Sequence, residues 1–280
     1  MSPPFKFKAR MKLFPNYAVL SLLVLFAVVP LIILVFNSLK TPAELGRNPL
    51  GPPKQLVWKN YPEAWIKGNF ANTTRNSVIL VVGTVTGVLV LGGMGAYSLA
   101  KLDIPGAGIF TMYLLVATSL PIQLFLVPLF FLWRQLGLVN NLLGVIIIYI
   151  AINSPFAIFL LRSYMLQLPS DFEDAARVDG ASEWAVFWRV VVPLSWPGFL
   201  TVGLVVALAT WNEFLIATVF LTDQRLFTVV TSYLSFATRF SRNWGLTSSS
   251  AVMMILPIIV IFLLLQRQFI EGLTQGGLKA

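Results

Sequence analysis

The sequence predicts an all-α polytopic membrane protein, a bundle of six transmembrane helices in a single domain over residues 1–280. Hydrophobic residues make up 57% of the chain and charged residues only 11%, whereas soluble domains carry about 25% charged residues. The mean hydropathy is +0.81. The apolar residues gather in long segments, which favours helices because a helix satisfies its own backbone polar groups where water is absent.

Six segments are apolar over the length of about 20 residues that a spanning helix needs. We expect spans at residues 17–36, 77–99, 109–132, 142–161, 199–221 and 248–266. The last reaches this length only by including the serines at 248–250. Residues 1–16 form a basic arm, and the apolar run after it is too long for a signal peptide and lacks a cleavage site. An uncleaved first span is therefore expected.

The charges restrict the function and the topology. The net charge is +9, but the basic residues are scattered over the loops without interleaved aromatics, which argues against nucleic acid and fits contact with membrane lipid. Without cysteine or histidine, a metal site is not expected. Lys and Arg divide evenly between the two sides of the membrane, so only the basic arm favours a cytoplasmic N-terminus. Six spans then place both termini in the cytoplasm.

The second expected span carries small residues at helical spacing. Gly83 and Gly87 stand four residues apart, which lets the backbone of a neighbouring helix approach closely. Packing within the chain is the favoured interpretation, and dimerisation through this face is the alternative.

Residues 168–197 form an acidic island between apolar segments. Ser170 and Glu173 have the spacing of a capping box at a helix start. Gly180 is placed to end this helix in a left-handed turn. Ser182 then caps a second helix, which we expect Pro193 and Pro197 to end. The island therefore predicts a hairpin of two short helices.

The first helix of this hairpin has a narrow apolar face. Phe172, Ala175 and Ala176 fall on one side by their spacing, as suits a helix that docks into a groove of a partner. The alternative is an amphipathic hairpin at the lipid surface, anchored by Trp184 and Trp188. The acidic first helix argues against it, because anionic lipid repels acidic residues.

Specific motifs in this region resemble a known family. Asp174-Ala175-Ala176-x-x-x-Gly180-x-Ser182, followed by Val192-Pro193, resembles the cytoplasmic coupling loop of permease subunits in type I binding-protein-dependent ABC importers, with Asp in place of the usual Glu. Further stretches resemble the sugar branch, and above all the smaller permease of maltose- and trehalose-type importers. They are Asn60-Tyr61, Asn76-Ser77, Pro121-x-Gln123, Trp211-Asn212-Glu213-Phe214 and Trp244-Gly245-Leu246.

This resemblance implies a translocation subunit in a bacterial or archaeal cytoplasmic membrane. The implied partners are a second permease, two ATPase subunits that bind ATP and Mg, and an extracytoplasmic binding protein that delivers a di- or oligosaccharide such as maltose, maltodextrin or trehalose. The coupling residues would be Phe172, Asp174, Ala175, Ala176, Gly180, Ser182 and Pro193. Residues 276–280 would contact the ATPases and 223–241 the binding protein, the alternative being an ordinary tail and loop.

The chain itself is not expected to be an enzyme or to hold a cofactor. It has no Gly-x-x-x-x-Gly-Lys-[Ser/Thr] phosphate loop, so ATP hydrolysis would belong to the partner subunits. No catalytic residue is expected, because the spans lack the His, Cys, paired acids or metal ligands that a membrane enzyme uses.

Polar residues within the spans are candidates for the substrate path, because such groups are costly in lipid. They are Gln123, Asn153, Trp211, Asn212 and Glu213. Glu213 is the only acid within a span; a gate, a packing role or a pair with Arg225 or Arg134 are alternatives to sugar contact. An ion-coupled secondary transporter that uses Glu213 as its coupling site is the alternative function.

Overall fold

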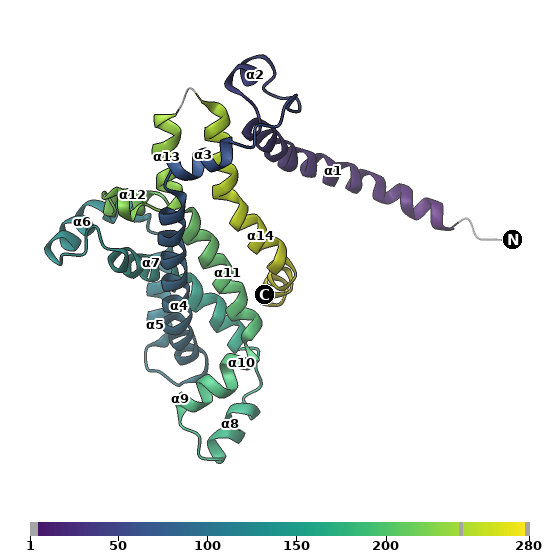
Figure 1. The fold of residues 1–280 in the computed structure, drawn as a ribbon. Helices are drawn as coiled ribbons and strands as arrows, with labels where there is room; N and C mark the ends of the chain where they lie inside the picture. Colours follow the sequence, from purple (N-terminus) through teal and green to yellow (C-terminus); the bar gives the residue numbers. More distant parts are fainter. Residues whose placement is uncertain (1–4, 241–242, 278–280) are drawn as a thin grey trace. The chain divides into compact units, whose positions relative to one another are not determined.

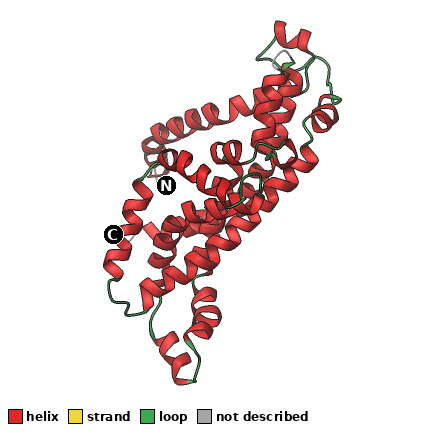
Figure 2. Ribbon diagram, turned by 90° about the vertical axis from the view of Figure 1, so that its left-hand side faces the viewer, coloured by secondary structure: helices red, strands yellow, loops and turns green. Residues whose placement is uncertain are grey.

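The computed structural model describes residues 5–240 and 243–277, and every secondary-structure element in these ranges is helical (Figure 2). The all-α class is therefore confirmed. The chain divides into two compact units, which are described separately. The first comprises Met1–Gly68 with Tyr233–Ile255, and the second Asn69–Ser232 with Leu256–Ala280.

The first unit begins with the long helix α1 (Phe5–Ser38). Within its part Asn16–Ser38, the most apolar window of 18 residues has a mean hydropathy of 3.2 and contains no buried residue. A helix so apolar and so exposed is suited to lipid contact. The short helices α2 (Pro42–Arg47) and α3 (Asn60–Lys67) follow. Parts of α13 (Val229–Arg239) and α14 (Trp244–Gly277) complete the unit, and its small core joins Ala64, Phe236 and Leu246.

A buried polar cluster joins the elements of this first unit. The Asn60 amide donates to the carbonyl oxygens of Ser38 and Lys40, at 2.9 and 3.0 Å. The Ser249 hydroxyl also donates to Ser38 O, at 3.0 Å. Lys40 is fully buried and donates to Asn37 Oδ1 and to the carbonyl of Asn48. These bonds satisfy the backbone groups where α1 ends.

The second unit is built on three packed helices, α4 (Phe70–Lys101), α7 (Leu142–Met165) and α11 (Trp196–Asn212). Figure 1 shows shorter elements at both ends of α4. One end carries the 3₁₀ turn η1 (Ile122–Phe125), α6 (Leu126–Gln135), α12 (Leu215–Phe220) and the turn η3 (Gln224–Leu226). The other carries α8 (Asp171–Val178), α9 (Glu183–Val186), the π-helical turn η2 (Phe187–Val191) and α10 (Val192–Leu194).

Glycines of α4 set the close packing of this unit. A Cβ atom on Gly83 would lie 2.7 Å from Ile146 Cδ1, and one on Gly87 would lie 2.2 Å from Ile150 Cδ1, both on α7. A Cβ on Gly93 would lie 2.9 Å from the Phe199 ring of α11. The Gly83–Gly87 pair therefore serves packing within the chain, as expected.

The segment expected as one span over 109–132 is broken in the structure. Helix α5 (Ala107–Ser119) ends before Leu120, and the helical run 122–135 continues at an angle of 89°. Leu120 is extended, with φ −85° and ψ 123°, because the residue before a proline is pushed out of the helical region. Pro121 also has no N–H to continue the helix.

The segment expected over 199–221 is also divided. Helix α11 ends at Asn212, Glu213 is extended, and α12 begins at Leu215. Helix α14 is longer than the expected span at 248–266. Within the described residues, four helices are long and apolar enough to cross a membrane, and up to six if each of two bent helix pairs forms one span.

Candidate functional site: an acidic helical hairpin

The acidic island folds as the expected hairpin at one end of the second unit (Figure 1). Helix α8 is followed by Gly180 with φ +83°, the left-handed conformation that favours glycine. The Ser182 hydroxyl then accepts a hydrogen bond from Ala185 N at 3.3 Å and caps α9. The turn and the second cap are confirmed.

The prediction of a capping box at Ser170 is wrong. Ser170 has helical φ and ψ angles, and its side chain makes no capping bond. The Glu173 carboxylate turns inward instead, where its Oε1 lies 2.7 Å from Lys101 Nζ at the end of α4. The two side chains are only 3% and 9% exposed, and Lys101 also donates to the carbonyl of Leu168 at 2.7 Å. A buried carboxylate without a partner would cost much more free energy than the loss of one capping bond at the surface. The ion pair with Lys101 therefore decides the direction of the Glu173 side chain.

A guanidinium joins the two limbs of the hairpin. Arg177 of α8 donates from Nε to Glu183 Oε1 of α9 at 2.7 Å, and from Nη1 to Asp174 Oδ1 at 2.8 Å. Glu183 also accepts a hydrogen bond from the Tyr97 hydroxyl of α4. Hydrogen bonds from Arg177, and secondly from Tyr97, lower the pKa of Glu183. The hairpin is therefore held to α4 at both of its limbs.

The second limb ends between Pro193 and Pro197, as expected, although Pro193 itself lies within the helical run. The helical run 183–194 passes through Pro193, which sits in the first turn of α10 directly after the π-helical turn η2. The run ends at Ser195, and α11 leaves at an angle of 80° with Pro197 in its first turn. The wider π turn precedes the proline and accommodates its missing N–H.

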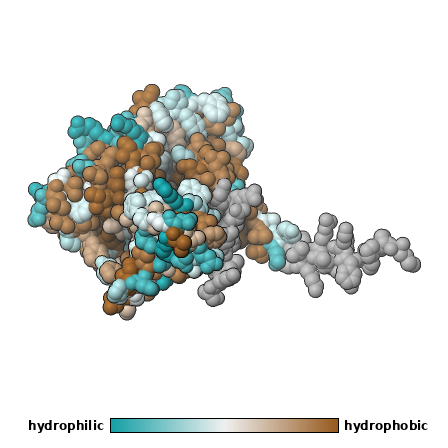
Figure 3. Space-filling view, turned by 90° about the horizontal axis from the view of Figure 1, so that it is seen from below, coloured by the Kyte–Doolittle hydropathy of each residue, from teal (hydrophilic) through white to brown (hydrophobic). Residues whose placement is uncertain are grey.

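The outer surface of the hairpin offers apolar side chains amid acids. Phe172 is 53% exposed, Ala175 is exposed, and Ala176 is half-buried against the core of the unit. Phe172 and Ala175 thus remain accessible, whereas Ala176 partly faces inward. Figure 3, seen from the end where α8 and α9 lie in Figure 1, shows hydrophilic residues gathered amid a largely hydrophobic surface.

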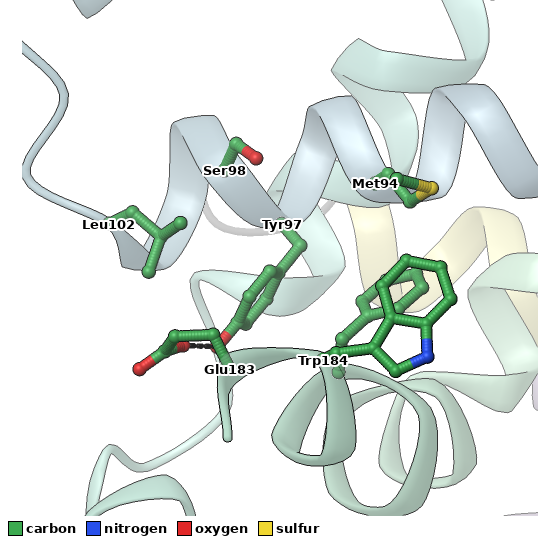
Figure 4. Close-up of a pocket in the computed structure, with 7 residues that line it drawn as sticks. Met94, Tyr97, Ser98, Leu102, Glu183 and Trp184 are labelled. Carbon is green, nitrogen blue, oxygen red and sulfur yellow. Dashed lines mark hydrogen bonds between the residues drawn. The ribbon is translucent and has the colours of Figure 1, made fainter.

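A small hollow lies between the end of α4 and α9. Its volume is about 160 Å³, and Met94, Tyr97 and Leu102 line one side. Figure 4 shows the Tyr97 hydroxyl directed at Glu183, with Trp184 placed across from Met94. Phe187 is buried beneath, with its ring centroid 5.4 Å from that of Tyr97. The contact between α4 and α9 is therefore partly polar and partly aromatic.

Glu213 lies in the break between α11 and α12 and caps the latter. Its carboxylate accepts hydrogen bonds from Ile216 N at 3.0 Å, Ala217 N at 3.2 Å and the Tyr149 hydroxyl of α7 at 2.6 Å. No ion pair to Glu213 occurs among the described residues, and Arg225 pairs with Asp223 instead. Tyr149 was not expected at this site; it stands on another helix, and no sequence pattern linked it to Glu213.

The other substrate-path candidates are spread over several elements. Asn153 lies one turn after Tyr149 on α7 and donates to the backbone carbonyl of Tyr149 at 2.8 Å. Asn212 is exposed and donates to its own helix at Leu208 O. Gln123 is exposed on η1, whereas Trp211 is buried. The structure thus joins Glu213, Tyr149 and Asn153 by hydrogen bonds.

At the opposite end of α4, amide side chains hold the loop 221–229. Asn76 donates to the carbonyls of Arg225 and Phe227, at 2.9 and 3.1 Å. Asn140, whose φ is +55°, accepts from the backbone N–H groups of Thr222 and Asp223, at 2.7 and 3.0 Å. This loop opens the stretch 223–241 that was expected to meet a binding protein. Within the described residues, no three His, Cys, Asp or Glu side chains are grouped to hold a metal.

Comparisons with known proteins agree with this geometry. Residues 89–274 match the family of binding-protein-dependent transport system inner membrane components. The chain is 35% identical to the arabinooligosaccharides transport system permease protein AraQ of Bacillus subtilis, over 99% of this chain and 98% of that protein. It is 31% identical to the diacetylchitobiose uptake system permease protein NgcG of Streptomyces coelicolor, over 94% and 88%. Identity to the trehalose transport system permease protein SugB of Mycobacterium tuberculosis is also 31%, over 94% and 97%.

A solved structure shares the fold. It belongs to a bacterial ABC transporter involved in the import of the acidic polysaccharide alginate. The match has a TM-score of 0.80 at 26% identity and covers 96% of this chain and 100% of that chain.

The helical fold and the hairpin define a membrane-embedded permease, a translocation subunit rather than an enzyme. The chain belongs to the family of binding-protein-dependent transport system inner membrane components. The resemblance expected from the Asp174-Ala175-Ala176 motif is thereby confirmed. Membership implies that the chain works with a substrate-binding protein and an ATPase.

Proposed function

We propose that this chain is one of two permease subunits of an ATP-driven importer for a di- or oligosaccharide. The observation that carries the proposal is the hairpin of α8 and α9, an acidic element with exposed Phe172 and Ala175 that is fastened to the end of α4. A partner can bind the exposed face of this hairpin, and the bonds to α4 make the hairpin move together with a spanning helix.

In this proposal, two ATPase subunits bind ATP and Mg, and residues 168–197 dock on one of them. Phe172, Asp174, Ala175 and Ala176 form the docking face on α8. Gly180, Ser182 and Pro193 shape the turn and the second limb behind it. Closure of the ATPases would displace the hairpin, and α4 and α11 would follow because they are joined to it.

The sugar class is supported by the relatives, which are named for arabino-oligosaccharides, diacetylchitobiose and trehalose. All three are short saccharides. These names support the expected class of a di- or oligosaccharide, and trehalose is among them, whereas none of the three names maltose. Gln123, Asn153, Trp211, Asn212 and Glu213 stay the candidates for this chain's part of the path, with Tyr149 added by its bond to Glu213.

We further propose a bacterial or archaeal cytoplasmic (inner) membrane as the location, with both termini in the cytoplasm. The hairpin then faces the ATPases, and residues 223–241 face the binding protein on the opposite side; of these, residue 241 lies outside the described residues. For residues 276–280 we propose contact with the ATPases; of these, 278–280 lie outside the described residues. The alternative of an ion-coupled transporter gains no support from the comparisons or from Glu213, whose carboxylate caps α12.

The test is purification of the complex in mild detergent after expression with its neighbouring subunits. We expect an ATPase and a second permease to co-purify with the wild-type chain. Ala175→Arg should abolish retention of the ATPase, because a long cation on the exposed face of α8 blocks docking. Gln135→Arg adds the same charge at an exposed position at the end of α6 and should leave the complex intact. Equal retention in both variants would contradict the proposal.

A further inference from the structure

Helix α4 runs without a proline from Phe70 to Lys101. Its 32 residues make it about 48 Å long, at about 1.5 Å per residue. A helix of this length reaches from one end of the second unit to the other, and each end carries polar side chains that bind a different segment of the chain.

At its beginning, α4 holds the backbone of residues 225–229. Asn72 and Asn76 donate to the carbonyl of Arg225, at 2.7 and 2.9 Å, and Asn76 also donates to Phe227 O. The Ser77 hydroxyl accepts from Val229 N at 2.9 Å. Asn76 and Ser77 are buried, at 5% and 2% exposure, so these bonds are shielded from competing water.

At its last turn, α4 holds both limbs of the hairpin. Lys101 binds Glu173 of α8 within a buried ion pair, and Tyr97, one turn earlier, donates to Glu183 of α9. The two limbs are thus attached at two points on the same helix. A displacement of the hairpin as a whole has to act on this end of α4.

Between its ends, α4 has little room to bend or to slide. Gly83 and Gly87 lie against Ile146 and Ile150 of α7 so closely that no Cβ would fit without a shift. Gly93 lies nearly as close to the Phe199 ring, where a Cβ would stand 2.9 Å from the nearest ring atom. Interiors packed at this density have low compressibility and transmit strain.

We propose that α4 carries the coupling between the hairpin and the loop 221–229, so that the nucleotide state of the ATPases changes the conformation of this loop at the opposite end of the unit. This inference rests on the proposed function, since it takes the hairpin as the ATPase contact. Asn72, Asn76, Ser77, Tyr97 and Lys101 are then positioning residues that fasten the two ends of one rod.

The loop has a second tether that does not pass through α4. Asn140 lies between α6 and α7 and holds Thr222 and Asp223. Asn140→Gly removes that tether and keeps the left-handed backbone possible. It therefore loosens the same loop without touching α4, and it serves as the matched control.

The experiment uses the absence of cysteine from this chain. Gln224→Cys places a single thiol at an exposed position of the loop. The complex is purified with its ATPases and reconstituted in lipid nanodiscs. The rate of maleimide labelling at residue 224 is measured without nucleotide and with Mg-ATP and vanadate, and the ratio of the two rates reports the effect of nucleotide on the loop.

We expect a ratio that departs from 1 by about two-fold or more. Tyr97→Phe keeps the ring but removes the hydroxyl, which donates to Glu183 and accepts from Arg177 Nη2 at 3.4 Å. Ser77→Ala removes the hydroxyl that accepts from Val229 N. Each variant should bring the ratio toward 1. The two positions are about 30 Å apart along the helix, where independent effects normally multiply. If both bonds act through α4, the double variant Tyr97→Phe with Ser77→Ala should instead resemble the stronger single variant. Asn140→Gly combined with Tyr97→Phe should show multiplied effects, because Asn140 acts outside α4.

The inference would be overturned by a parent ratio of 1 or by unchanged ratios in Tyr97→Phe and Ser77→Ala. Multiplied effects in the double variant Tyr97→Phe with Ser77→Ala would overturn it as well. A failure of the proposed function is seen separately, because no ATPase would then be present in the purified complex. If the ATPase co-purifies but the labelling ratio at residue 224 is unchanged by the variants in α4, only the inference about α4 is overturned.

Discussion

The ammonium group of Lys101 lies 2.7 Å from the carboxylate of Glu173, although 71 residues stand between them in the sequence and both side chains are more than nine-tenths buried. The pair links the end of a membrane-spanning helix to the first limb of the hairpin. Removing one partner of such a pair leaves the other charge buried and uncompensated.

We therefore expect Glu173→Gln to lower the free energy of unfolding by about 3–5 kcal/mol. Replacing both partners, as Lys101→Met with Glu173→Leu, should recover most of this loss because no charge stays buried. Thermal unfolding of the purified chain in detergent measures both. Glu63→Gln at the exposed Lys67–Glu63 pair is the control and should change stability by less than about 1 kcal/mol. Equal losses at the two pairs would contradict a buried, structural ion pair.

The turn of the hairpin should be sensitive to backbone conformation alone. Nothing lies within 4 Å of the place where a Cβ of Gly180 would stand, so a substitution meets no steric contact there. At φ +83°, Gly180→Val should destabilise the turn by about 1–2 kcal/mol or more, whereas Gly180→Asn should cost less because asparagine adopts this region more readily. Thermal stability and ATP-driven uptake of both variants test this; identical behaviour would refute it.

Close packing of α4 on α7 predicts a specific rescue. Gly87→Ala forces a methyl group into Ile150 and should cost about 1–3 kcal/mol. Ile150→Ala in the same chain makes room for that methyl and should reduce the penalty of the Gly87 change. At Gly203 of α11 the nearest atoms would be 3.6 Å away, so Gly203→Ala should be neutral or slightly stabilising. Melting temperatures of Gly87→Ala, Ile150→Ala, their double variant and Gly203→Ala provide the measurement. A penalty at Gly203 equal to that at Gly87 would argue against the packing.

A substitution at Glu213 distinguishes the importer from the alternative function, an ion-coupled transporter. If the carboxylate caps α12 and binds Tyr149, Glu213→Gln should keep ATP-driven uptake while weakening the cap by about 0.5–2 kcal/mol. An ion-coupling residue would behave differently, because its neutral form cannot exchange the coupled ion. Uptake into vesicles with and without an ionophore distinguishes them; complete loss of uptake in the variant, together with sensitivity of the wild type to the ionophore, would favour the alternative.

The sequence predicted the features that depend on local pattern. The hairpin, the left-handed turn at Gly180 and the cap at Ser182 follow from residue types at short spacing, and the structure has all three. The close approach at Gly83 and Gly87 follows from helical periodicity. Each of these features is determined by residues that lie within one or two helical turns of one another in the sequence.

Features that depend on distant partners escaped prediction. Ser170 and Glu173 have the spacing of a capping box, but burial next to Lys101 decides the direction of the Glu173 side chain. A pair of Glu213 with an arginine was one of the alternatives left open, yet backbone N–H groups and Tyr149 satisfy its carboxylate. The break at Leu120 was missed although Pro121 signals it, because the apolar run 109–132 masks the local rule.

The docking of α8 on an ATPase subunit is tested most directly by crosslinking. Phe172→Cys places the only thiol of the chain at the exposed face of α8, and Phe26→Cys places it on the exposed apolar surface of α1 as a control. With a short bifunctional reagent in native membranes, we predict an adduct between residue 172 and the ATPase and none from residue 26. No adduct at residue 172 in a complex that contains the ATPase would contradict the account.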